Sequence, residues 1–135
     1  MKNSSIKKKI INAPISIGEL VDKITILEIK KNKLQNSKLE NVLKELSFLR
    51  KLMAKHQIEI TDNLFTQLKE INLKLWNIED QIRIKEKNKE FDNIFIELAR
   101  SVYFKNDKRA EIKKRINQLS NSCLLYTSPS PRDTR

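Results

Sequence analysis

Two short stretches of the chain carry the residue types that could bind a charged ligand. The first holds Trp76, Glu79, Asp80 and Arg83, and the second holds Arg100, Tyr103, Asn106, Asp107 and Arg109. Within each stretch, residues three or four positions apart share one face of a helix. Arginine forms paired hydrogen bonds to carboxylate and phosphate groups. If the two stretches pack side by side, they form a site for a small anion, such as a phosphorylated sugar, a nucleotide or a carboxylate.

The same residues also fit a purely structural role. Arg83 has Glu79, Asp80 and Glu86 at helical spacing, which favours ion pairs along one helix, and Asp107 is a suitable capping residue. A small helical enzyme that binds a dicarboxylate through Arg50, Arg83, Arg100 and Arg109 is a further alternative, by analogy of fold alone. The spacing does not choose among these readings.

Other kinds of catalytic chemistry find little support in the sequence. His56 is the single histidine, and no Glu-x-x-His pair of the di-iron type is present. Gly18 is the single glycine, so a glycine-rich phosphate loop is excluded. We therefore expect no catalytic residue, no metal and no cofactor.

The composition predicts a helical protein. The chain has 135 residues with one glycine and three prolines, whereas β-sandwiches, barrels and doubly wound folds need both residue types at many turns. No apolar run approaches the ~18 residues of a membrane span, and the N-terminus does not resemble a secretory signal. We expect a soluble, cytoplasmic, single-domain protein.

The charge is strongly basic, with 28 Lys and Arg against 17 Asp and Glu, a net +11. Such a surface attracts phosphates, and the resulting binding is weak and salt-dependent. No known nucleic-acid-reading motif is present. Weak, non-specific nucleic-acid binding is the second alternative.

Apolar residues recur every three or four positions and predict about five helices. The first three are expected at residues 16–34, 37–56 and 62–88. A fourth is expected to start at Asp92 or Asn93, and a fifth, capped by Asp107, to follow a break at Asn106. Capping boxes at Ser16–Glu19 and Ser37–Glu40 mark the first two starts. The expected fold is all-α, an antiparallel hairpin bundle with coiled-coil-like packing. One long central helix extends beyond its neighbours and offers a surface for a homo-oligomer.

Three segments divide the chain. Residues 1–13 are predicted to be a disordered basic arm, and 14–122 the helical domain. Residues 123–135 hold two of the prolines and the single cysteine, and they resemble a translated sequencing-library adapter. We interpret them as a non-native tail on a truncated chain; a native Ser/Pro-rich tail is the alternative.

Several motifs resemble an uncharacterised family of short bacterial and phage proteins that carry a domain of unknown function. They are residues 13–30 (APISIGELVDKITILEIK), 75–83 (LWNIEDQIR), 95–103 (FIELARSVY), 106–110 (NDKRA) and 113–117 (KKRIN). The resemblance implies a helical fold and a bacterial or phage source, and it implies no activity. The leading functional hypothesis is a non-catalytic, self-associating helical binding or assembly module.

Overall fold

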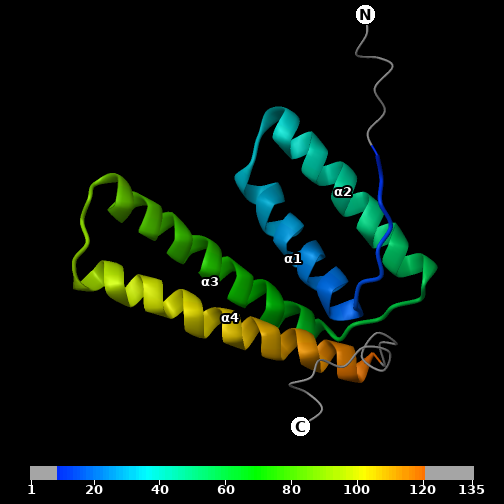
Figure 1. Ribbon diagram of the computed structural model, residues 1–135. Coiled ribbons are helices and arrows are strands. Elements are labelled where there is room, and N and C mark those ends of the chain that lie inside the picture. Colours follow the sequence, from blue (N-terminus) through cyan, green and yellow to red (C-terminus); the bar gives the residue numbers. More distant parts are fainter. Residues whose placement is uncertain (1–8, 121–135) are drawn as a thin grey trace, which may run out of the picture.

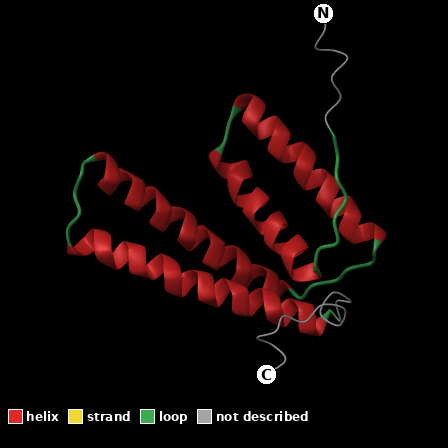
Figure 2. Ribbon diagram, in the orientation of Figure 1, coloured by secondary structure: helices red, strands yellow, loops and turns green. Residues whose placement is uncertain are grey.

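The structure, a computed structural model, describes residues 9–120 and shows four helices in that range, without a strand (Figure 1, Figure 2). The helices are α1 (Ile17–Lys33), α2 (Asn36–Lys55), α3 (Asp62–Lys87) and α4 (Asn93–Leu119). They pair as two hairpins, α1 with α2 and α3 with α4. The predicted all-α fold is confirmed.

Helix α1 joins the two hairpins because it is apolar on two sides. One core lies between α1 and α2 and contains Leu20, Ile24, Leu27, Val42, Leu46 and Leu49. The other core lies between α1, α3 and α4 and contains Val21, Leu64, Leu68, Ile71, Ile112 and Ile116. Burying one such side chain stabilises the fold by about 1.5–3 kcal/mol. The adjacent residues Leu20 and Val21 belong to different cores, so α1 is the central helix of the assembly.

Three helices begin at a side-chain cap, and two of these caps, Ser16 and Asp92, lie where the sequence predicts a helix to start. The backbone N–H of Glu19 donates to Ser16 Oγ at 3.2 Å, that of Leu64 to Thr61 Oγ1 at 3.3 Å, and that of Phe95 to Asp92 Oδ1 at 3.0 Å. Each bond satisfies a backbone donor that the helix itself cannot, and a cap of this kind contributes about 1 kcal/mol.

The predicted capping box at Ser37–Glu40 is wrong. Helix α2 begins at Asn36, and its N-cap Gln35 makes no side-chain capping bond. Asn36 has φ of 62°, the left-handed region that asparagine tolerates better than most residues. Because the chain reverses there so tightly, Ser37 already lies inside the helix.

The predicted break at Asn106 and Asp107 is also wrong, so the described residues form four helices and not five. Asp107 lies in the middle of α4 and caps nothing. Asparagine and aspartate cost less than about 0.7 kcal/mol each inside a helix, and the half-buried or buried face of α4 continues from Val102 through Arg109 to Ile112. The packing of this face outweighs the local preference for a break.

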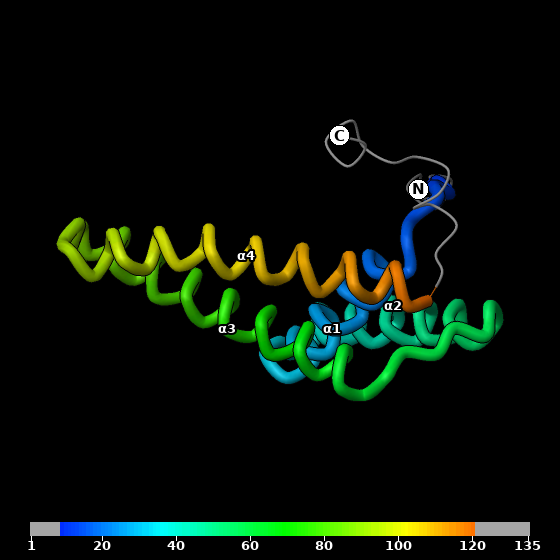
Figure 3. The backbone as a smooth tube through the Cα atoms, turned by 90° about the horizontal axis from the view of Figure 1, so that it is seen from below, coloured from blue at the N-terminus to red at the C-terminus, as the bar shows by residue number. Residues whose placement is uncertain are grey.

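The prediction of a single long central helix is wrong as well, since α3 and α4 have 26 and 27 residues and form a pair of nearly equal length. Together they extend well past α1 and α2 (Figure 1, Figure 3). No residue between Leu75 and Ile112 is buried, whereas both of these end residues are. The distal part of the hairpin therefore has two helices but no closed core of its own.

The terminal predictions fall mostly outside this range. Residues 1–8 of the predicted basic arm and residues 121–135, which include the predicted non-native tail, are not among the described residues. Residues 9–16 carry no helix. Within residues 9–120, no helix has the length and apolar character needed to cross a membrane.

Candidate functional site

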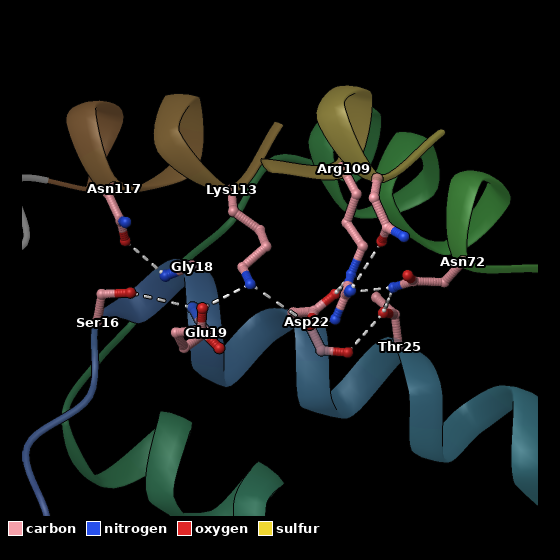
Figure 4. Close-up of polar contacts among 10 residues, drawn as sticks. Ser16, Gly18, Glu19, Asp22, Thr25, Asn72, Arg109, Lys113 and Asn117 are labelled. Carbon is pink, nitrogen blue, oxygen red and sulfur yellow. Dashed lines mark hydrogen bonds and ion pairs between the residues drawn. The ribbon is translucent and has the colours of Figure 1, made fainter. Parts of the chain in front are cut away.

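Buried polar side chains gather where α1 meets the α3–α4 hairpin (Figure 4). Asp22 and Thr25 on α1 are 2% and 0% exposed, and Asn72 on α3 is 6% exposed. They occupy positions inside an otherwise apolar interface. Burying such groups is costly unless every polar atom finds a partner, so their bonds determine whether the junction is stable.

The carboxylate of Asp22 is the centre of this network. Arg109 on α4 donates to it twice, from Nε to Oδ1 at 3.0 Å and from Nη2 to Oδ2. Asn72 Nδ2 donates to Asp22 Oδ1 at 2.9 Å and to Thr25 Oγ1 at 2.8 Å. Lys113 Nζ lies 3.7 Å from Asp22 Oδ2. Three helices thus meet at one carboxylate.

The ionisation of this pair follows from its contacts. Burial alone raises the pKa of Asp22, but the hydrogen bonds from Arg109 and Asn72 and the nearby positive charges outweigh burial and hold that pKa below its usual value. The hydrogen bond to Asp22 in turn raises the pKa of Arg109. Both groups are therefore charged at neutral pH.

Next to the network, α1 touches the end of α4 at Gly18. The Gly18 N–H donates to Asn117 Oδ1 at 2.6 Å. A Cβ at position 18 would lie 2.6 Å from the backbone oxygen of Lys113, closer than carbon atoms approach such a group. The single glycine of the chain therefore permits close helix contact, a use quite different from a phosphate loop.

A pocket of about 220 Å³ opens beside the network, between α1, α3 and α4. Its lining includes four of the nine residues predicted to bind a ligand, and the full set is Ile26, Ile29, Asn72, Leu75, Trp76, Glu79, Asn106 and Arg109. Arg109 Nη1 donates to Asn106 Oδ1 at 3.3 Å. The fold thus brings Trp76, Glu79, Asn106 and Arg109 together at one pocket.

The other five predicted residues lie elsewhere. Arg100 and Tyr103 line a separate groove with Ala99 and Phe104, on the face of α4 opposite its half-buried residues. Asp80, Arg83 and Asp107 are exposed and line neither pocket. Within residues 9–120, Arg83 has no ion pair with Glu79, Asp80 or Glu86, so the predicted intrahelical pairs are wrong.

Comparison with known proteins gives one match. A family model described as a family of unknown function, DUF6165, matches residues 11–130. The chain belongs to this family. No curated protein and no solved structure matches it. Membership of this family shows which proteins the chain is related to, and its function is inferred from the site.

In this DUF6165 protein, sequence reasoning missed the residues at the centre of the junction: Gly18, Asp22, Thr25, Asn72, Lys113 and Asn117. One signal was present, since Asp22 and Thr25 interrupt the apolar run of the first helix at a spacing of three. Their partner Arg109 is 87 residues from Asp22 along the chain, a distance that periodicity cannot bridge.

The described part of this DUF6165 protein shows no grouping of three or more histidine, cysteine or acidic side chains suited to a metal ion. His56 is the exposed C-cap residue of α2, close to where the sequence placed that helix end. A further hollow of about 440 Å³ lies on α1 and α2, lined in part by Lys31, Arg50 and Lys51. The pocket beside Asp22 and the outward groove of α4 differ from it in holding residues from the predicted ligand-binding set.

Proposed function

We propose that this protein is a non-catalytic helical assembly module that self-associates through the outward face of α4. The observation that carries the proposal is a row of exposed side chains on the part of the hairpin that lacks a core. We call this row the α4 stripe; it consists of Ile96, Ala99, Arg100, Tyr103 and Phe104. Ile96, Tyr103 and Phe104 are 51%, 68% and 58% exposed.

The α4 stripe is continuous because its members are three or four residues apart. The rings of Tyr103 and Phe104 meet edge to face with centroids 5.7 Å apart, and the guanidinium of Arg100 lies 6.0 Å from the Phe104 ring centroid. Aromatic residues and arginine are enriched at protein interfaces, and a contiguous exposed apolar patch marks an interaction site more often than scattered residues do.

A second copy of the chain fits this stripe. If two α4 helices pack antiparallel about a twofold axis between Tyr103 and Phe104, Arg100 of one copy lies opposite Asp107 of the partner subunit. The same axis gives the reciprocal pair, so the stripe is complementary to itself in charge as well as in apolar character. Two distal hairpins would then form a four-helix layer in which the two stripes are buried between the α4 helices.

The mass of the full chain in solution tests the proposal. We expect a dimer by light scattering and sedimentation equilibrium at tens of micromolar, and a monomer for Tyr103→Glu at the same concentration. Phe48→Glu is the matched control, because Phe48 is 65% exposed on the other hairpin, on α2, and that variant should remain dimeric. A monomeric wild-type protein, or a dimer that Tyr103→Glu leaves intact, would refute the proposal. The proposed module is a cytoplasmic protein of a bacterium or phage, as the sequence predicts.

A further inference from the structure

The pocket beside Asp22 has an apolar wall and a polar rim. Ile26 and Ile29 of α1 and Leu75 of α3 provide aliphatic surface, and Trp76 adds an indole ring. Its volume of about 220 Å³ exceeds the ~150 Å³ of an engineered protein cavity that takes up benzene. A compound with a short hydrocarbon chain therefore fits.

The charge of the pocket rim determines whether the pocket favours an anionic or a cationic ligand. Arg109 is the cation of the pocket, and both of its strong hydrogen bonds go to the buried carboxylate of Asp22. Glu79 is exposed and has no cation within 4.0 Å among residues 9–120. Arg109 carries one positive charge and is attracted by two carboxylates, that of Asp22 in direct contact and that of Glu79 at longer range. The pocket rim around Arg109 therefore keeps a net negative charge.

The hydrogen bonds of Asn72 also favour a ligand that donates. The amide nitrogen of Asn72 is used for Asp22 and Thr25, so the group that Asn72 can offer to a ligand is its carbonyl oxygen. An indole face attracts a cation through its ring electrons. Carboxylate, carbonyl oxygen and indole all favour a hydrogen-bond donor with positive charge.

From this arrangement we propose that the pocket binds a small primary ammonium compound with a short aliphatic chain. The ammonium group lies between the Glu79 carboxylate and the Trp76 ring, and the chain lies against Ile26, Ile29 and Leu75. This ligand has the opposite charge to the anion expected from the arginines in the sequence. The reason is that the fold pairs Arg109 with the carboxylate of Asp22, which the sequence alone did not predict.

The protein contains its own reporter for this site, because Trp76 is its single tryptophan. We would titrate the full chain with n-butylammonium, butanoate and n-butanol, which share a hydrocarbon chain and differ in charge. Trp76 fluorescence and the NMR shifts of the Asn72 and Asn106 side-chain amides give two independent readouts. The expected result is saturable binding of n-butylammonium, at least tenfold tighter than that of the other two probes.

Two variants that each remove one negative charge distinguish binding at the pocket from the effect of the general electrostatic potential of the surface. Glu79→Gln should weaken n-butylammonium binding about tenfold, whereas Asp80→Asn should leave it unchanged, since Asp80 is exposed and does not line the pocket. Three results would overturn the inference: no saturable change in either readout, tighter binding of butanoate, or equal affinity in wild type and Glu79→Gln. Both side chains are exposed, so neither variant is expected to disturb folding.

Discussion

Asp22 on α1 and Arg109 on α4 form a two-point ion pair across the junction of the two hairpins (Figure 4). The carboxylate is almost fully buried, while the side chain of Arg109 is 28% exposed. Removing one partner of such a pair leaves the other charge without compensation, which costs more than the intact pair contributes. The junction therefore depends on both residues being present.

The first prediction concerns the loss of Arg109. Arg109→Ala should lower the free energy of unfolding by about 3 kcal/mol, the lower end of the range for a broken buried pair, because Arg109 is partly exposed. Urea unfolding followed by circular dichroism measures the change. Arg83→Ala removes an exposed arginine from α3 and should change stability by less than about 0.5 kcal/mol. Equal effects of the two substitutions would show that the pair is not needed.

The second prediction concerns Gly18. Gly18→Ala improves helix propensity by up to about 1 kcal/mol, yet its Cβ would lie 2.6 Å from the Lys113 backbone oxygen. Because backbone cannot move aside as a flexible side chain does, we expect a net loss of about 1–3 kcal/mol in thermal or urea unfolding. Asn117→Ala removes the hydrogen bond to Gly18 without the clash and separates the two effects. A Gly18→Ala protein more stable than wild type would contradict the close contact.

The elements that could be predicted from the sequence are those fixed by local interactions. Ser16 and Asp92 cap their helices through bonds to residues three positions away, so the sequence alone locates these starts. The break expected at Asn106 is absent because packing against other helices, which local preference does not register, continues through that position. The site could be predicted in part for the same reason. Trp76 and Glu79 lie on one helix face, which their spacing shows. The hydrogen bond from Arg109 to Asp22 joins two helices, so it follows only from the fold.

The third prediction is a loss of stability in acid. The pKa of Asp22 is lower in the folded protein than in the unfolded chain, where an aspartate titrates near ~3.9. The unfolded chain therefore binds the proton first as pH falls. The stabilisation by Asp22 is complete above the unfolded pKa and is lost as pH falls towards the folded pKa. Urea midpoints measured from pH 7 down to pH 2 should fall more steeply for wild type than for Asp22→Asn; parallel curves would rule out this contribution.

The last prediction tests the geometry of the proposed dimer through charge. Arg100→Asp places a carboxylate opposite Asp107 of the partner subunit, and Asp107→Arg places two guanidinium groups opposite each other. Like charges facing across an interface disfavour association, so each single variant should dissociate more readily in sedimentation equilibrium. The double variant restores opposite charges at both ends of the stripe and should recover most of the lost affinity. Both substitutions are at exposed positions of α4, so at concentrations low enough for all proteins to be monomeric the unfolding curves of the three variants should stay close to that of the wild type. If the double variant is weaker than either single variant, Arg100 and Asp107 do not face each other and the antiparallel arrangement about Tyr103 and Phe104 is incorrect.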